Sequence, residues 1–326
     1  MKIVIVGGVG YIGSHVVLAA LDQGYEVTVF DDLSTSNKSN INPNVKLIIG
    51  STKSKKDLSN LLKDNHYDGI IHLAAEKAAG ESMTNPRLYT ENNIIGSLNL
   101  INKCIKYKIK NFIFSSSAAV YGNPQYNPID ELHPRKPQSY YGYTKLVIEE
   151  NLKWYSRLYN FKYASLRYFN AAGYDIKKRI KGFEINSKNL IPNVMEVAIG
   201  LKPYLPIFGN QYKTKDGTGV RDYVHVNDLA KAHIKALEYL TNEKKDLIIN
   251  LGTEQGYSVM EILKAAKKIT KINIPYKIEN SRPGDIESAM ANCALAKDQI
   301  GWAHPNSCLD KIIESTWNMY NSNFFQ

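Results

Sequence analysis

The sequence contains little cysteine and no long apolar run. Its 326 residues include three cysteines, Cys104, Cys293 and Cys308, an odd number without the close spacing of metal ligands. No apolar stretch approaches the roughly 20 residues that cross a bilayer, and Met1 leads directly into an apolar strand pattern without a signal-peptide region or cleavage site. We therefore expect a cytoplasmic protein with reduced thiols, no metal site and no membrane partner.

The charge is basic but not concentrated. The 41 lysines and arginines exceed the 31 aspartates and glutamates, which gives a net charge of +10. Strong positive charge is typical of proteins that bind nucleic acid or anionic surfaces, but here the lysines are scattered and no basic stripe is interleaved with aromatic residues. The pattern indicates a solvated surface, and no nucleic-acid partner is expected.

Short β-branched runs alternate with amphipathic helical windows in the first half of the chain. Strands are predicted at residues 2–6, 26–30, 46–49, 69–73, 112–115, 163–168 and 247–251, and helices at residues 14–23, 97–106, 143–158 and 226–240. This alternation predicts an α/β protein with a Rossmann-type doubly wound parallel sheet. Residues 1–175 form one expected domain and residues 176–326 a smaller mixed α/β domain, interrupted where about 222–252 return to the sheet.

A glycine-rich turn follows the first predicted strand. Gly7, Gly10 and Gly13 satisfy a G-x-x-G-x-x-G pattern, and Gly8 starts an overlapping G-x-G-x-x-G. Glycine lets the backbone approach a pyrophosphate closely, and the following helix supplies N–H groups and a positive dipole. The turn between strand and helix therefore predicts a dinucleotide site.

Two aspartates indicate which dinucleotide is bound. Asp31 ends the second predicted strand, about 20 residues after the glycine turn, where a carboxylate accepts hydrogen bonds from ribose hydroxyls. Asp32 adjoins it, and no cation occurs before Lys38. Because a 2′-phosphate would be repelled there, the sequence favours NAD over NADP.

A tyrosine and a lysine four residues apart form the candidate acid/base pair. Tyr141 and Lys145 lie at the start of the helix predicted over residues 143–158, and their spacing places both on one face. A free tyrosine has a pKa of about 10 and is a poor base at neutral pH. A nearby ammonium and an oxidised nicotinamide both favour the phenolate. Tyr140 is a weaker candidate, because a spacing of five residues separates its side chain from Lys145.

Three serines close the strand that precedes this helix. Ser115, Ser116 and Ser117 should lie at the C-terminal edge of the sheet, where open α/β folds place their sites. A hydroxyl there can relay a proton between substrate and tyrosine. Capping of a helix or turn explains Ser115 or Ser116 equally well, so the choice of Ser117 as the catalytic serine depends on a family resemblance.

Five segments together resemble the extended short-chain dehydrogenase/reductase family and, within it, the UDP-hexose 4-epimerases. They are residues 7–15 (GGVGYIGSH), 77–82 (KAAGES), 111–117 (NFIFSSS), 167–170 (RYFN) and 217–226 (GTGVRDYVHV). The second and fifth segments are more specific than the glycine turn, because most relatives on this fold lack them. The resemblance implies an NAD-binding first domain and a second domain that binds a UDP-sugar.

The resemblance also implies the binding residues. The NAD-binding set would be Gly7, Gly10, Tyr11, Ile12, Gly13, Asp31, Asp32, Leu33, Ser34, Ser36, Ser51, Thr52, Leu73, Ala74, Ala75, Lys77, Asn92, Ser117, Tyr141, Lys145 and Phe169. The UDP-sugar set would be Lys77, Ser117, Tyr141, Asn170, Asn189, Leu190, Pro206, Ile207, Phe208, Arg221, Arg282, Asp285 and Ala289. Arginine forks suit a diphosphate, and an aromatic ring suits uracil.

The implied reaction inverts C4 of a UDP-hexose through a 4-keto sugar. Tyr141 would take the C4 hydroxyl proton with help from Ser117, while hydride passes to a nicotinamide that is never released and then returns to the opposite face. Three positions depart from the family pattern: Val6 replaces a threonine, Ser51 replaces an aspartate near the adenine, and Ala119 replaces a threonine. None of the three belongs to the acid/base pair.

Other functions and an oligomeric state follow from the same resemblance. A UDP-glucuronate 4-epimerase or decarboxylase stays open, as does a non-catalytic NAD-binding regulatory protein. A 4,6-dehydratase is a poor match, because Ala118 and Ala119 stand where such enzymes carry an acid pair. The family usually forms homodimers through helices flanking Asn92 and Lys145, and the candidate surface residues are Ile94, Ile95, Leu98, Leu100, Ile101 and Ile105.

One position predicts the substrate range. By alignment from Arg282 and Asp285, Ala289 occupies a place where some relatives carry a bulky tyrosine. It should leave room for a 2-acetamido group, so we expect turnover of UDP-GlcNAc and UDP-GalNAc as well as UDP-glucose and UDP-galactose. Ala289→Tyr should lose the acetylated pair and keep the other, as measured by turnover of both pairs. Equal UDP-GlcNAc turnover in the two enzymes would contradict this.

Overall fold

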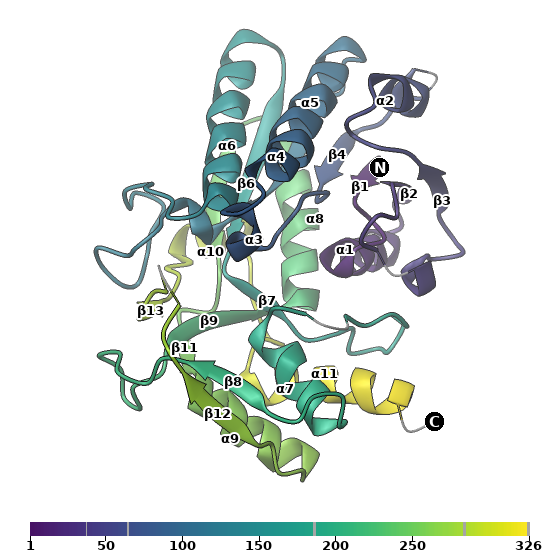
Figure 1. The fold of residues 1–326 in the computed structure, drawn as a ribbon. Coiled ribbons are helices and arrows are strands. Elements are labelled where there is room, and N and C mark those ends of the chain that lie inside the picture. Colours follow the sequence, from purple (N-terminus) through teal and green to yellow (C-terminus); the bar gives the residue numbers. More distant parts are fainter. Residues whose placement is uncertain (37, 64, 185–186, 283–284, 325–326) are drawn as a thin grey trace.

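The computed structural model describes residues 1–36, 38–63, 65–184, 187–282 and 285–324. Within these residues the largest element is a parallel sheet of seven strands in the order β10–β6–β5–β4–β1–β2–β3 (Figure 1). Its strands are β1 (Lys2–Val6), β2 (Glu26–Asp31), β3 (Lys46–Ile49), β4 (Gly69–His72), β5 (Asn111–Ser117), β6 (Lys162–Tyr168) and β10 (Leu247–Leu251). The strand order reverses between β1 and β4, the point where open α/β sheets bind ligands.

Helices cover both faces of this sheet. On one face, α1 (Tyr11–Asp22) and α8 (Val226–Glu243) bury Val16 and Leu229 in a core that also contains Ile3 and Ile5 of β1. On the other, α2 (Lys55–Leu62), α5 (Gly96–Lys106) and α6 (Tyr140–Leu158) bury Leu58, Leu100 and Ile148 against Val4 and Val6. Alternate side chains of β1 thus enter opposite cores, as a strand's period of two requires. The prediction of a Rossmann-type doubly wound fold is confirmed.

A smaller mixed α/β part packs around a core of its own. Its helices and strands are α7 (Leu190–Ala198), α9 (Val259–Thr270), α11 (Leu309–Phe324), β7 (Asn170–Ala172), β8 (Leu205–Phe208), β9 (Val220–His225), β11 (Gly256–Ser258), β12 (Tyr276–Glu279) and β13 (Ser288–Ala289). Strand β9 pairs with β7, β11 and β13, while β8 pairs with β12. Val194, Ile262 and Ile312 of the three helices lie in the core, below the large sheet in Figure 1.

The chain passes between the two parts more than once. Strand β10 lies beside β6 in the large sheet and α8 covers that sheet, whereas β9, which directly precedes α8, belongs to the small sheet. The division at residue 175 stays a prediction. The remaining elements are η1 (Lys38–Asn40), α3 (Ala79–Ser82), α4 (Pro86–Tyr89), the π-helical turn η2 (Thr90–Ile95), η3 (Ala118–Val120) and α10 (Ala294–Ile300).

Helix α6 begins three residues earlier than the predicted boundary at residue 143. The Ser139 hydroxyl accepts a hydrogen bond from the Gly142 amide and caps the helix, so that Tyr140 is its first residue. Both Tyr141 and Lys145 are therefore inside the helix. Among the described residues no helix is both long enough and apolar enough to cross a bilayer.

Candidate active site

A cavity of about 580 Å³ opens at the C-terminal edge of the large sheet, at the point where the strand order reverses. Most of the predicted NAD-binding residues line it: Gly7, Gly10, Tyr11, Ile12, Gly13, Asp31, Asp32, Ser34, Ser36, Thr52, Leu73, Ala74, Ala75, Lys77, Asn92, Ser117, Tyr141, Lys145 and Phe169. Asn170, Asn189 and Leu190 of the predicted substrate set line it too. Leu33 and Ser51 are not among the lining residues, although their chain neighbours are.

The glycine turn fits a dinucleotide. A Cβ on Gly7 would lie 2.6 Å from the Ala74 nitrogen, and one on Gly13 would lie 2.0 Å from the Gly7 oxygen, so the protein's own backbone excludes side chains there. A Cβ on Gly10 would meet no protein atom closer than 3.4 Å, yet Gly10 lines the cavity. The protein therefore has room for a side chain at Gly10, and its absence keeps the cavity wall open to a ligand.

Asp31 is held rigidly at the cavity wall. One carboxylate oxygen accepts from the Val9 amide at 3.0 Å, and the other accepts from the Leu33 amide at 2.9 Å and the Ser36 hydroxyl at 3.1 Å. The Asp31 side chain is almost fully buried yet still lines the cavity. Since each carboxylate oxygen has more than one acceptor site, the group retains capacity to accept from ribose hydroxyls.

Helix α6 and strand β5 bring the three predicted catalytic residues together. The Ser117 side chain lies close enough to the Tyr141 hydroxyl to lower its pKa, and both residues line the cavity. The Lys145 ammonium donates to the Ser115 carbonyl at 2.7 Å and lies 5.7 Å from the centre of the Tyr141 ring. Tyr140 points elsewhere, with its hydroxyl 2.6 Å from that of Thr90. The pair predicted from spacing therefore shares one end of the cavity, and the competing tyrosine does not reach it.

Burial dominates the electrostatics of this pair. Loss of solvent raises the pKa of Tyr141, and the hydrogen bond from Ser117 lowers it only in part. Burial also lowers the pKa of Lys145 to about 7, against the opposing charge of Glu149. In the protein alone, desolvation penalises both charged forms and sets the direction of the Tyr141 shift. The combined effect of the ammonium and an oxidised nicotinamide on the phenol stays a prediction. A titratable pair with opposed shifts in one cleft is nevertheless typical of an active site.

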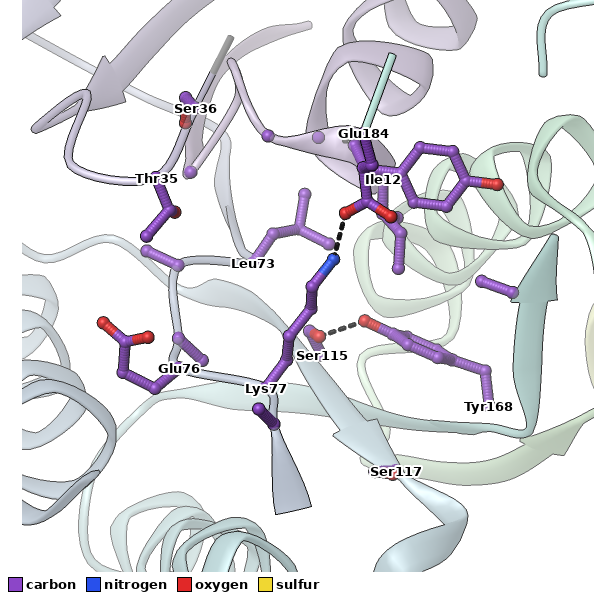
Figure 2. Close-up of a pocket in the computed structure, with 18 of the residues that line it drawn as sticks. Ile12, Thr35, Ser36, Leu73, Glu76, Lys77, Ser115, Ser117, Tyr168 and Glu184 are labelled. Carbon is purple, nitrogen blue, oxygen red and sulfur yellow. Dashed lines mark hydrogen bonds and ion pairs between the residues drawn. The ribbon is translucent and has the colours of Figure 1, made fainter. Parts of the chain in front are cut away.

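The serines have more specific contacts than the sequence indicated. Ser117 also caps η3, accepting from the Ala119 amide at 3.2 Å, so the capping role falls on the candidate catalytic serine. The Ser115 hydroxyl is hydrogen-bonded to Tyr168, a second tyrosine that lines the cavity (Figure 2). Sequence reasoning missed Tyr168, although it ends a predicted strand at the same sheet edge.

A charged pair spans the cavity. Figure 2 shows Lys77 extending from the loop after β4 to the Glu184 carboxylate, with which it forms an ion pair. The two residues are 107 positions apart, and nothing in the sequence pattern marks Glu184. Other lining residues outside the predicted sets are Val6, Phe30, Thr35, Gly50, Glu76, Ala78, Ala171, Ala172, Ile191, Pro192 and Tyr223.

Four residues of the predicted UDP-sugar set do not line the cavity but form a separate cluster. The Arg282 guanidinium lies over the Phe208 ring at 4.6 Å, and its Nε donates to Asp285 at 3.1 Å. Arg221 also approaches Asp285, at 3.5 Å. Phe208, Arg221, Arg282 and Asp285 thus lie together, as a shared ligand requires.

Three further residues of the predicted substrate set, Pro206, Ile207 and Ala289, lie on the strands of the smaller part. Ile207 is buried in the core of the smaller part, and Pro206 precedes it on β8. Ala289 is nearly buried, pairs with Arg221 between β13 and β9, and belongs to a core cluster. The effect of its small side chain on substrate range stays a prediction.

The family model for the NAD-dependent epimerase/dehydratase family matches residues 3–252. The chain belongs to this family, as the sequence resemblance indicated. It is 41% identical to a UDP-glucose 4-epimerase of Bacillus subtilis, over 99% of this chain and 98% of that protein.

Solved structures give the same relationship. A UDP-glucose 4-epimerase of Stenotrophomonas maltophila with bound NAD and formylated UDP-arabinopyranose matches with a TM-score of 0.95 at 34% identity, covering 99% of this chain and 98% of that chain. A UDP-glucose 4-epimerase of Bifidobacterium longum in complex with NAD+ and UDP matches with a TM-score of 0.92 at 34% identity, covering 99% of both chains.

Replacing Gly10 or Gly13 by alanine should have different effects on folding and on NAD binding. Gly10→Ala should fold like the wild type but lose bound dinucleotide at least tenfold, because its methyl group enters only the cavity. Gly13→Ala should be strongly destabilised, because its methyl group overlaps the Gly7 carbonyl. Thermal unfolding and the NAD released from denatured protein measure both. Full NAD content in Gly10→Ala would show that the turn does not hold the dinucleotide.

Proposed function

We propose that this chain interconverts UDP-hexoses by inverting C4 through a 4-keto sugar, with NAD retained throughout. The observation that carries the proposal is that Tyr141, Ser117 and Lys145 line the same cavity as the glycine turn and Asp31. NAD, when bound, accepts the C4 hydride and returns it. The residues proposed to hold it are the lining residues of the predicted NAD set, with Asp31 at the adenosine ribose.

The chain's own groups handle the proton. Tyr141 takes the proton from the C4 hydroxyl as the hydride leaves and gives it back when the hydride returns, with Ser117 bridging phenol and sugar. Lys145 supplies the positive charge that stabilises the phenolate. Burial raises the pKa of Tyr141, and an oxidised nicotinamide bound beside it would supply a further positive charge that favours the phenolate. Base strength is thereby coupled to the oxidised cofactor.

The substrate is proposed to lie with its sugar near Tyr141 and its nucleotide toward the cluster of Phe208, Arg221, Arg282 and Asp285. The two guanidinium groups suit a diphosphate, and Phe208 offers a ring face to uracil. Asn170 and Asn189 line the cavity together with Tyr141. Inversion requires the keto sugar to turn over, so a firm grip on the nucleotide and a loose one on the sugar serve the reaction.

The alternatives fit less well. A uronate substrate requires a cation for its C6 carboxylate, and among the described lining residues the cations are Lys77 and Lys145. The first is paired with Glu184 and the second donates to the Ser115 carbonyl. A purely regulatory NAD-binding protein has no need for the buried acid/base pair that is present here.

The activity is tested with the purified protein and no added cofactor. It should carry NAD and equilibrate UDP-glucose with UDP-galactose. Tyr141→Phe should lower kcat by about 10²–10⁴-fold, the usual contribution of a general acid/base, while retaining NAD. Tyr140→Phe is the matched control, because it removes a neighbouring phenol that contacts Thr90, and it should keep wild-type kcat. Equal activity of the Tyr141 and Tyr140 variants would overturn the assignment.

We further propose that the protein is a homodimer and that it is cytoplasmic. Tyr143, Trp154 and Leu158 expose about half or more of their surface along one face of α6, and Ile95, the last residue of η2, is also exposed. Clustered exposed apolar side chains are typical of interfaces. Of the residues expected from sequence, Leu100 and Ile101 lie in the core instead. A reducing compartment is supported by Cys104 and Cys293, free thiols whose pKa burial raises.

The dimer is tested by placing charge on this face. Trp154→Glu combined with Leu158→Glu should convert a dimer into a monomer without unfolding it, as measured by analytical ultracentrifugation and circular dichroism. The reason is that both side chains are exposed in the single chain, so their replacement costs the fold little. A wild-type protein that sediments as a monomer at micromolar concentration would rule the dimer out.

A further inference from the structure

The three consecutive serines of β5 engage three residues of α6 spaced four apart. Ser117 lowers the pKa of the neighbouring Tyr141, the Ser115 carbonyl accepts from Lys145, and the Ser116 hydroxyl donates to the Glu149 carboxylate at 2.5 Å. Residues four apart on a helix share one face, so Tyr141, Lys145 and Glu149 form a single row facing the strand. The first two are the acid/base pair, and the third has no role in the proposed mechanism.

Both carboxylate oxygens of Glu149 accept hydrogen bonds within a buried network. The Arg167 guanidinium on β6 donates to it through Nε at 2.9 Å and Nη2 at 2.6 Å, a bidentate pair in which both side chains are at most 2% exposed. Arg167 continues to the Tyr121 hydroxyl at 2.9 Å, which donates to Asn250 at 2.6 Å. Helix α6 is thereby tied to β5, β6, β10 and the segment after η3 through one carboxylate.

The charges around Lys145 come from every element packed against it. Tyr141 and Glu149 lie on its own helix, His72 on β4 and Tyr168 on β6, and its ammonium also lies 5.0 Å from the Phe114 ring. Burial keeps His72 neutral, because it lowers the pKa of that residue to about 3. Glu149 is therefore the formal negative charge that acts on Lys145, and it opposes the lowering of the Lys145 pKa by burial. Around Glu149 itself stand Arg167, Arg135 at 3.9 Å, Tyr121, Tyr163 and Ser116.

We propose that Glu149 is a positioning residue of the acid/base pair, which sets the register of α6 on β5 and supplies the negative charge that keeps Lys145 protonated beside Tyr141. The inference rests on the proposed function and deepens it. Arg167 and Ser116 hold the carboxylate in place, and Lys145 transmits its effect to the phenol. The alternative is a buried ion pair that only stabilises the fold, and that pair would leave the ionisation of Tyr141 unchanged.

The sign of the effect follows from the charges. Removing the carboxylate in Glu149→Gln lets Lys145 lose its proton more readily, so the phenolate loses its neighbouring cation and forms only at higher pH. The rising limb of the kcat–pH profile should move up by about one pH unit, which lowers kcat about tenfold on that limb. The tyrosinate absorbance that disappears on Tyr141→Phe should shift in the same direction, a readout that needs no turnover.

Glu150→Gln is the matched control. Glu150 follows directly on the same helix, is partly exposed and pairs with Arg135 at 2.5 Å. The control removes the same charge and leaves the Arg167–Glu149 pair intact. It should keep the wild-type pH profile and the wild-type Tyr141 titration.

A second variant separates function from folding. Glu149→Gln leaves the Arg167 charge buried without a partner, which is strongly destabilising. The double variant Glu149→Gln with Arg167→Met removes both charges and should fold more readily. It should still show the upward shift, because Lys145 again lacks its carboxylate.

The outcomes are distinct for the two proposals. A folded Glu149 variant with the wild-type limb and the wild-type Tyr141 titration would overturn the positioning role. Failure of both Glu149 variants to fold would show a structural role only and would also overturn it. Lack of epimerase activity in the wild type would count against the proposed function instead, and the absorbance titration would still decide the role of Glu149.

Discussion

The packing of α6 on the C-terminal end of β5 is the constraint on which the site depends. It removes a phenol and an ammonium from water together, and the contacts along the three serines keep them within reach of each other. Desolvation raises the pKa of Tyr141 and lowers that of Lys145. Desolvation therefore favours the neutral form of both groups in the protein alone.

The large sheet supplies the rest of the geometry. Because β1, β2, β4, β5 and β6 are parallel, their C-terminal ends meet at one edge, and the loops that follow them form a single cavity. The glycine turn, Asp31 and the Lys77 loop come from three of these ends. The smaller part adds the opposite wall, including Glu184 and Asn189. Dinucleotide and sugar can therefore meet where two separately packed cores face each other.

The division of labour between the two parts suits a reaction that must release neither the cofactor nor the keto sugar. The proposed cofactor side is closely packed: Asp31 is nearly buried, and the backbone leaves no room for a side chain at Gly7 or Gly13. The Phe208–Arg282–Asp285 cluster is more exposed and held by side-chain pairs. The Arg167–Glu149 pair is buried, whereas the Arg282–Asp285 pair is more exposed and is therefore screened more strongly by solvent.

The sequence by itself determined the features that depend on near neighbours. The strand–helix alternation, the glycine turn, Asp31 and the Tyr141–Lys145 spacing each express chemistry within one or two elements, so the pattern was sufficient to predict them. Only the tertiary structure decided the partners of these groups. Glu184 meets Lys77 across 107 residues, and Glu149 meets Ser116 across 33. Tertiary packing also decided that Ile207, Leu100 and Ile101 belong to cores, and that burial rather than a neighbouring charge governs Tyr141. Burial is a property of the assembled layers, and no local pattern of residues contains it.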